Sequence, residues 1–151
     1  MIKMVKLLVL FHSQQHGNTE KMTKAIAEGL KSEGCEVILH NANEKRYPVE
    51  ELVEYDCVAL GTPDYYGYIT GTMKTFMDDF YFLKKKIEYQ KRPIGVFYSH
   101  GGGGRVRDSL TIFGGIGDRV GESVESNGTP SKEVLDKCID LGLKLAKASQ
   151  V

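Results

Sequence analysis

The sequence predicts an α/β fold with a parallel sheet, and three observations carry this prediction. Short apolar runs that suit buried strands alternate with longer segments whose apolar residues recur every three or four positions. The resulting β-α-β-α-β order implies parallel strands joined by right-handed crossovers. The chain has 151 residues and contains no internal repeat, low-complexity tract or domain linker. We therefore expect one three-layer α/β/α domain over residues 1–151, with a five-stranded parallel sheet in the order 2-1-3-4-5.

The first strand, loop and helix form the most informative stretch. Residues 7–11 are an unbroken apolar run, and residues 12–18 form a polar loop before a helix. The apolar face of that helix consists of Met22, Ala25, Ile26, Gly29 and Leu30. Free backbone amides converge at a helix N-terminus and favour anions there. We interpret the loop as a phosphate site formed by these amides with the side chains of Ser13, Asn18 and Thr19. The alternative is that Ser13 or Asn18 only caps the helix.

The same loop argues against several other classes of phosphate-binding protein. It has no lysine or arginine and no GxxxxGK motif followed by Ser or Thr, which excludes a P-loop nucleotide triphosphatase. Gly17 is its only glycine, so the dinucleotide-binding pattern GxGxxG is absent. The strand end lacks the carboxylates of a receiver domain, and the loop lacks the cysteine nucleophile of a low-molecular-weight tyrosine phosphatase. A phosphate monoester bound largely by backbone amides is the ligand that remains.

The middle of the chain predicts two more strands and two helices. Residues 36–40 suit an edge-side strand, a short helix begins at Pro48, and residues 57–60 form the third strand. A turn-rich loop then places three tyrosines at the carboxyl edge of this strand, namely Tyr65, Tyr66 and Tyr68. The next helix carries an apolar stripe that we interpret as core rather than as a cofactor contact. That stripe consists of Met73, Phe76, Met77 and Phe80.

The fourth strand, at residues 94–98, leads into Ser99, His100 and four successive glycines. Because glycine has no side chain, backbone amides in such a loop can approach a flat ligand closely. A flexible loop without a ligand is the alternative interpretation. At the end of a parallel strand we favour the ligand-binding one.

The remaining residues predict a helix, a strand and a final helix. The helix carries Val106, Leu110 and Phe113 on its inner face, and the fifth strand covers residues 122–125. Thr129 with Pro130 is expected to open the last helix. Its inner face would carry Leu135, Cys138, Ile139, Gly142 and Ala146.

The composition argues against several kinds of partner. Twenty basic and twenty acidic residues give a formal net charge of zero, without the basic surplus usual in nucleic-acid-binding proteins. No apolar run approaches the roughly 20 residues of a membrane span, and the N-terminal segment lacks a signal-peptide cleavage site. The cysteines Cys35, Cys57 and Cys138 lie far apart and show no metal-ligand spacing. We expect a cytoplasmic protein with reduced thiols, no metal, and no membrane or nucleic-acid partner.

Three of the predicted loops meet at one edge of the sheet. In an open α/β sheet, a ligand lies outside the carboxyl ends of the strands, where the strand order reverses. In the order 2-1-3-4-5 this point lies between strands one and three, so the phosphate loop and the tyrosine loop flank it, with the glycine loop alongside. A phosphate at one end, a planar aromatic in the middle and amides at its polar edge match flavin mononucleotide (FMN).

The motifs HSQQHGNTEKM, GTPDYYGYITGTMKTFMDD and FYSHGGGG resemble the flavodoxin-like superfamily over nearly the whole chain, and especially its branch near the WrbA-type NAD(P)H:quinone oxidoreductases. The resemblance implies a flavodoxin-like fold with bound FMN. The residues that it assigns to the phosphate are Ser13, Gln15, Gly17, Asn18 and Thr19. Those that it assigns to the isoalloxazine are Thr62, Pro63, Asp64, Tyr65, Tyr66 and Gly67. Contacts to the pyrimidine side of the ring would come from Ser99, His100, Gly101 and Gly102.

Three functions are compatible with this resemblance. Electron transfer through bound FMN to a redox partner protein is favoured by the small size of the chain and by the GNTEKM loop. A small WrbA-like reductase that uses NAD(P)H and a quinone or flavin is favoured by the net charge of zero. It is also favoured because the loop beyond Tyr98 holds only His100 and glycines, which leaves one ring face open. A flavodoxin-fold interaction module without flavin is the third interpretation.

Two further expectations concern assembly and catalysis. The chain lacks the extra segment with which WrbA-type enzymes build tetramers, so we expect a monomer or a homodimer. His100 is the candidate catalytic residue. The alternative is that His12, His16 and His100 all make ordinary hydrogen bonds at loops and strand ends.

Overall fold

A computed structural model describes residues 4–14 and 17–150 of the protein. In this part of the chain six parallel strands form one sheet in the order β2-β1-β3-β4-β5, with β6 also paired to β4. The strands are β1 (Lys6–Phe11), β2 (Glu36–Asn41), β3 (Cys57–Pro63), β4 (Arg92–His100), β5 (Gly117–Arg119) and β6 (Val124–Asn127). The predicted parallel sheet and its order 2-1-3-4-5 are therefore confirmed.

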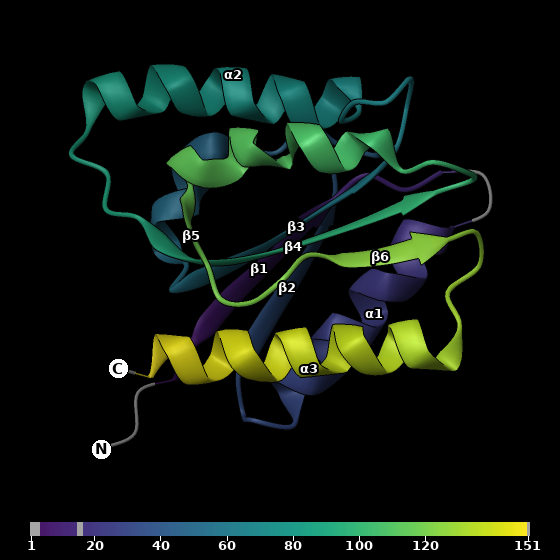
Figure 1. Cartoon of the computed structure of the whole chain (residues 1–151). Coiled ribbons are helices and arrows are strands. Elements are labelled where there is room, and N and C mark those ends of the chain that lie inside the picture. The colour runs from purple at the N-terminus through teal and green to yellow at the C-terminus, as the bar shows by residue number, and fades with distance from the viewer. Residues whose placement is uncertain (1–3, 15–16, 151) are drawn as a thin grey trace.

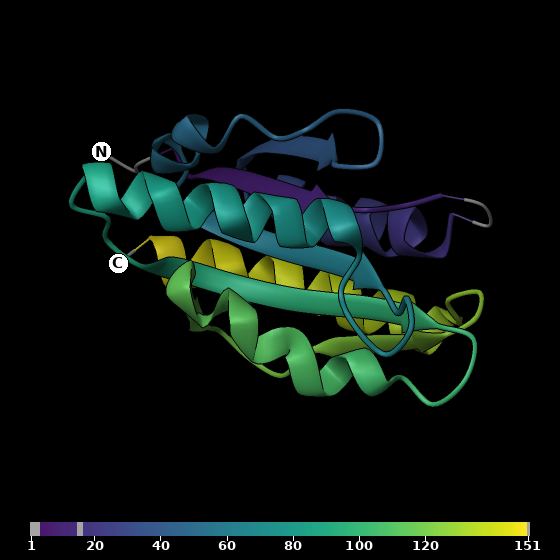
Figure 2. The same ribbon diagram turned by 90° about the horizontal axis from the view of Figure 1, so that it is seen from above.

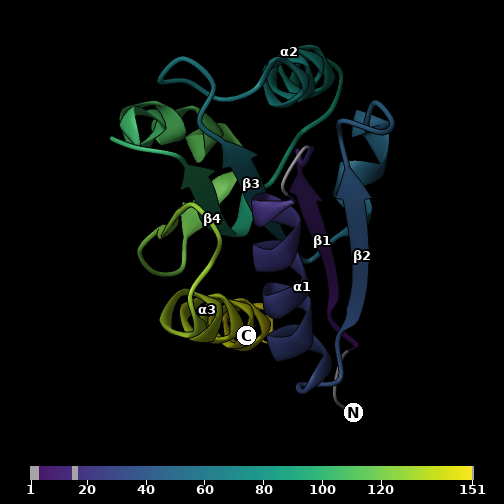
Figure 3. The same cartoon turned by 90° about the vertical axis from the view of Figure 1, so that its right-hand side faces the viewer.

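Helices cover both faces of this sheet. Figure 1 shows α2 on one side of the strands and α1 with α3 on the other, and the turned views in Figures 2 and 3 agree. The α-helices are α1 (Asn18–Lys31), α2 (Gly71–Lys86) and α3 (Lys132–Ser149). Two 3-10 helices, η1 (Val49–Glu54) and η2 (Arg105–Gly115), pack with α2 in one apolar core, and α1 and α3 enclose the other. The molecule therefore has the predicted three layers.

The burial pattern explains why these segments form these elements. The last five residues of β1 are buried, as expected for a strand with a helical layer on each face. The predicted apolar faces of α1 and α2 are buried as well. The backbones of α1 and α3 are in contact where the two helices cross. A Cβ added at Gly142 would lie only 2.4 Å from the carbonyl oxygen of Ile26. Glycine is required at this crossing because only its missing side chain allows so close an approach.

Two strands are longer than the apolar runs suggest. β3 continues to Pro63 and β4 to His100, and their ends pair in register, with Thr62 opposite Tyr98 and Pro63 opposite Ser99. Thr62, Pro63, Ser99 and His100 were expected in loops but lie in the sheet, whereas Tyr98 was expected in the fourth strand and lies there. Hydropathy missed the first four because polar side chains at the carboxyl edge can still belong to a hydrogen-bonded strand.

The C-terminal elements also differ from their predicted positions. One strand was expected here, at residues 122–125. The structure has two short strands, β5 and β6, of which β6 overlaps the expected range. β5 pairs with the start of β4, and β6 pairs with its end. The last helix begins at Lys132, after Ser131, whose hydroxyl accepts the Val134 amide, rather than at Thr129 and Pro130. The N-cap hydrogen bond of the Ser131 side chain fixes where this helix begins. Within the described residues, no helix is long and apolar enough to cross a membrane.

Candidate functional site

A cavity of about 240 Å³ opens at the carboxyl ends of β1, β3, β4 and β6. Because β1 and β3 are neighbours whose connections leave in opposite directions, this is the point where the strand order reverses. Its walls come from four separate stretches of the chain. The lining residues are Gln14, Asn18, Thr19, Pro63, Asp64, Tyr65, Ser99, His100, Gly101 and Gly128.

The N-terminus of α1 forms one end of the cavity. Gly17 precedes the helix in the left-handed conformation, with φ of 68°, and supplies no side-chain cap. The side chain of Ser13, which precedes the helix, caps α1 instead, since its Oγ accepts the Glu20 amide at 3.2 Å. Among residues 4–14 and 17–150, the amides of Asn18 and Thr19 have no hydrogen-bond partner, nor does the buried Oδ1 of Asn18. Amides in the first turn of a helix point along its axis away from the helix, so this helix end suits an anion, and the buried Asn18 Oδ1 adds one acceptor.

Thr19 and Ser99 tie this helix end to the sheet. Their hydroxyl oxygens lie 2.8 Å apart, and both side chains are buried. A hydroxyl can donate one hydrogen bond and accept two, so the pair keeps one O–H donor and spare acceptor capacity for polar atoms of a ligand.

A tight hairpin follows β3. Tyr65 and Tyr68 exchange two backbone hydrogen bonds of 3.1 Å across a turn formed by Tyr66 and Gly67. Both turn residues have positive φ, 58° and 76°, as a type I′ turn requires. A tyrosine in this conformation is unusual, and its side chain is fully exposed. The hairpin therefore presents Tyr66 to solvent beside the cavity rather than inside it.

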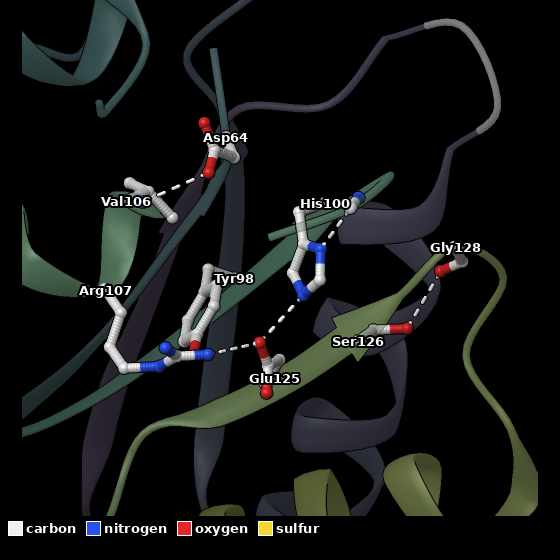
Figure 4. Close-up of polar contacts among 9 residues, drawn as sticks. Asp64, Tyr98, His100, Val106, Arg107, Glu125, Ser126 and Gly128 are labelled. Carbon is white, nitrogen blue, oxygen red and sulfur yellow. Dashed lines mark hydrogen bonds and ion pairs between the residues drawn. The ribbon is translucent and has the colours of Figure 1, made fainter. Parts of the chain in front are cut away.

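Asp64 connects this hairpin with η2. Its Oδ1 accepts the Gly67 amide at 2.6 Å. Its Oδ2 accepts the Val106 amide at 3.0 Å, as Figure 4 shows. Hydrogen bonds to an ionised carboxylate are among the strong ones in proteins. Asp64 therefore sets the spacing between the loops that follow β3 and β4.

His100 uses both ring nitrogens within the protein. Nδ1 accepts the Gly102 amide at 3.0 Å, and Nε2 lies 2.7 Å from Oε2 of Glu125 (Figure 4). Arg107 donates to the same carboxylate oxygen at 2.6 Å and to the Tyr98 hydroxyl at 2.7 Å. We call Tyr98, His100, Arg107 and Glu125 the His100 cluster.

Electrostatics within the His100 cluster favour an ionised carboxylate. Partial burial acts to raise the pKa of Glu125, but the hydrogen bond from His100 and the charge of Arg107 outweigh it, so the pKa lies below its usual value. Burial raises the pKa of the Tyr98 hydroxyl, and the hydrogen bond from Arg107 opposes this only in part. Glu125 is therefore a carboxylate and Tyr98 a neutral phenol at neutral pH.

His12 lies near the cavity but does not line it. Its Nδ1 is 2.7 Å from the Thr72 hydroxyl, and its ring meets Tyr65 edge-on with centroids 5.5 Å apart. Burial lowers the pKa of His12, while a hydrogen bond with Gln14 acts to raise it. His12 therefore acts as a neutral packing residue under Tyr65.

The cavity brings together eight of the predicted site residues. These are Asn18, Thr19, Pro63, Asp64, Tyr65, Ser99, His100 and Gly101. Six others lie close by without lining it, namely Ser13, Gly17, Thr62, Tyr66, Gly67 and Gly102. Thr62 is fully buried, and its hydroxyl donates to the Pro63 carbonyl and accepts the Thr70 amide. Gln15 and His16 lie outside the described residues.

Two lining residues were not among the predicted ones. Gln14 lies in the predicted phosphate loop, where only its neighbours were singled out. Gly128 follows β6, and its amide donates to the His100 carbonyl at 2.7 Å. The Asn-Gly-Thr turn at residues 127–129, at the end of a parallel strand, was the available signal for Gly128.

These features define a doubly wound α/β protein with a ligand cavity at the switch point of its sheet. The described residues contain no cluster of three or more histidine, cysteine or acidic side chains that could hold a metal ion. The family profile for flavodoxin matches residues 9–141, and the chain belongs to the flavodoxin family. Members of this family typically bind FMN.

Solved structures with the same fold include flavodoxins, a WrbA-like protein and a longer oxidoreductase. An archaeal flavodoxin is 23% identical with a TM-score of 0.80, over 97% of this chain and 100% of that one. A WrbA-like protein from Agrobacterium tumefaciens is 20% identical with a TM-score of 0.79, over 96% and 97% of the two chains. Rubredoxin oxygen:oxidoreductase from Desulfovibrio gigas is 21% identical with a TM-score of 0.82 over 95% of this chain. This chain spans only 36% of that enzyme's length.

Proposed function

We propose that this protein binds FMN in the cavity and transfers electrons through it as a flavodoxin-like carrier. The observation that supports this most directly is the pairing of a helix N-terminus with the ends of β3 and β4 around one cavity of about 240 Å³. A phosphate suits the free amides at the start of α1, and a planar ring suits the space beside Tyr65 and Gly101.

The residues present fit FMN in chemical type. The amides of Asn18 and Thr19 would donate to phosphate oxygens, with Gln15 as the further phosphate contact that the family resemblance suggests. The buried Oδ1 of Asn18 needs a donor, and a hydroxyl of the ribityl chain has that chemistry. Pro63 and Tyr65 would line the ring on the β3 side, and Ser99 and Gly101 would line it on the β4 side.

Bound FMN would supply the electron transfer, while the protein supplies position and electrostatics. Asp64 holds the Tyr66–Gly67 turn through the Gly67 amide and so keeps the loop after β3 in place. The Thr19–Ser99 hydrogen bond keeps the helix end at a set distance from the sheet. Both contacts join protein groups to one another, so neither uses an atom of the ligand.

A small NAD(P)H-dependent quinone or flavin reductase is the second candidate, and one observation favours it. His100 stacks on Tyr98 with ring centroids 6.2 Å apart and an angle of 25°, and it is bonded to Glu125. The ring of His100, at the end of β4, is therefore engaged by Tyr98 and Glu125, and the glycines that follow have no side chains to cover the ligand. A flavin with one face uncovered would admit a nicotinamide or a quinone.

Titration of apo-protein with FMN, followed by flavin fluorescence and visible absorption, tests the proposal. We expect a one-to-one complex with sub-micromolar affinity and much weaker binding of riboflavin, which lacks the phosphate. No FMN binding would overturn the proposal and favour the flavin-free interaction module. With the holoprotein in hand, direct oxidation of NADH or NADPH in the presence of a quinone would identify a reductase. A requirement for a separate reductase would identify a carrier.

A further inference from the structure

His100 joins three segments at the rim of the cavity. Its side chain contacts the amide of Gly102 in the glycine loop and the carboxylate of Glu125 on β6. Its backbone carbonyl accepts the amide of Gly128, which follows β6 and lines the cavity. Figure 4 shows the His100 ring extending from β4 toward Glu125 on β6.

The two ring contacts select one tautomer of His100. A ring nitrogen that accepts a hydrogen bond from an amide carries no proton, so Nδ1 is the unprotonated nitrogen. The proton of the neutral ring is then on Nε2 and is donated to Glu125. Arg107 keeps that carboxylate in place from the other side. Only 6% of the His100 side chain is exposed, so water cannot easily replace either contact.

Gly104 packs closely against the side chains of His100 and Glu125. It has φ of +63°, and a Cβ there would lie 2.8 Å from Oε2 of Glu125 and 2.9 Å from Nε2 of His100. By contrast, Gly103 has φ of +84°, and a Cβ there would meet nothing within 4 Å. The end of the glycine loop therefore closes directly over the His100–Glu125 hydrogen bond.

We propose that His100 is a positioning residue for the flavin: Glu125 sets its tautomer so that Nδ1 holds the Gly102 amide, and protonation of the ring releases the glycine loop and weakens FMN binding. This inference rests on the proposed function, because FMN is the ligand whose edge would meet Gly101. His100 itself moves no proton to or from the substrate in this role.

Protonation has opposite effects on the two ring contacts. The added proton goes to Nδ1, where it faces the N–H of Gly102, so an acceptor becomes a donor and the loop contact is lost. The contact with Glu125 becomes a full ion pair and persists. The charged or titratable groups that face the ring are Glu125 from β6, Arg107 from η2 and Tyr98 from β4, and the glycine loop contributes none. Release of the loop is therefore specific to the Nδ1 side.

The tautomer can be tested in the apo-protein by ¹⁵N NMR of the imidazole. We expect the Nε2–H tautomer at neutral pH, and a Gly102 amide shift that follows the same titration curve as the ring. An Nδ1–H tautomer, or a Gly102 amide that ignores the titration, would overturn the proposal. The variant Gly104→Ala should lose the Nε2–H signature, whereas Gly103→Ala, which also replaces a glycine of positive φ but meets no neighbouring atom, should keep it.

The effect on the ligand is tested by FMN affinity at high and low pH in three proteins. Wild type should bind about three- to tenfold more weakly once His100 is protonated, the factor expected for one lost hydrogen bond. His100→Asn retains an acceptor near Nδ1 that cannot titrate, so it should bind tightly at both pH values. His100→Ala should bind weakly at both. The FMN phosphate also titrates, with a second pKa of about 6, but it affects all three proteins alike.

The outcomes separate this inference from the proposed function. If wild type and His100→Asn show the same pH dependence, the role of His100 is wrong while FMN binding stands. If wild type binds no FMN at either pH, the proposed function fails and the role of His100 fails with it.

Discussion

The hydroxyl groups of Thr19 and Ser99 meet in a buried hydrogen bond of 2.8 Å, although the residues are 80 positions apart in the chain. Thr19 lies in the first turn of α1, and Ser99 is the penultimate residue of β4. Both line the cavity. The helix end that would receive a phosphate is therefore attached to the strand whose loop would receive the ring.

This hydrogen bond predicts a coupled effect of two substitutions on stability. Thr19→Val removes one partner and leaves the buried Ser99 hydroxyl unsatisfied, so we expect the free energy of unfolding to fall by about 1–3 kcal/mol. Adding Ser99→Ala should restore part of that loss, because the orphaned hydroxyl is removed too. Urea unfolding of the two single variants and the double variant gives the coupling energy. Strictly additive effects would show that the two hydroxyls do not interact in solution.

Asp64 provides a test of how the loops after β3 and β4 are held. Asp64→Asn places an amide group against one of two backbone N–H donors, so we expect a loss of about 1–3 kcal/mol in unfolding free energy and weaker FMN binding. Asp78→Asn is the matched control, since Asp78 forms an exposed pair with Lys74 four residues earlier. The control should change stability by less than about 0.5 kcal/mol. Equal effects of the two variants would contradict the connecting role of Asp64.

The crossing of α1 and α3 predicts that Gly142 cannot be replaced. In Gly142→Ala the new methyl group would lie 2.4 Å from the Ile26 carbonyl oxygen and 3.2 Å from the Leu30 nitrogen. These are backbone atoms, so the helices must separate. We expect a loss of about 1–3 kcal/mol in unfolding free energy, despite the higher helix propensity of alanine. Gly71→Ala, in the first turn of α2 with nothing within 4 Å of the new Cβ, should be close to neutral by thermal unfolding.

Glu125 predicts a specific change in stability with pH. Its pKa in the folded protein lies below the ordinary carboxyl value of about 4.3, since the hydrogen bond from His100 and the charge of Arg107 outweigh partial burial. Its contribution is therefore fully present above that ordinary value and is lost as the pH falls through the lowered pKa. The carboxylate side chain is 39% exposed, so screening limits the contribution to less than about 1 kcal/mol.

The measurement is unfolding free energy from about pH 6 to pH 3 for wild type and Glu125→Gln. Wild type should be the more stable protein at pH 6, and the two curves should converge as the pH falls. Curves for wild type and Glu125→Gln that stay parallel down to pH 3 would contradict the prediction.

Local sequence patterns predicted most of the strands and helices. The apolar run of β1 and the apolar stripes of α1 and α2 identified these elements because burial on a regular strand or helix repeats with a regular period. The same patterns failed where a polar group decided the boundary. Ser131 sets the start of α3 by capping it, and Thr62 continues β3 through a ladder of backbone hydrogen bonds. Periodicity does not record either interaction.

The sequence by itself determined the parallel sheet, its order and the three loops that gather at its switch point, because these follow from hydropathy and from the handedness of crossovers. Only the tertiary structure decided how the polar side chains in those loops are used. Thr19 pairs with Ser99, Ser13 caps α1, and His100 turns inward to Glu125. Each of these contacts joins residues whose distance depends on how the whole sheet packs, and no local pattern of residue types encodes that distance.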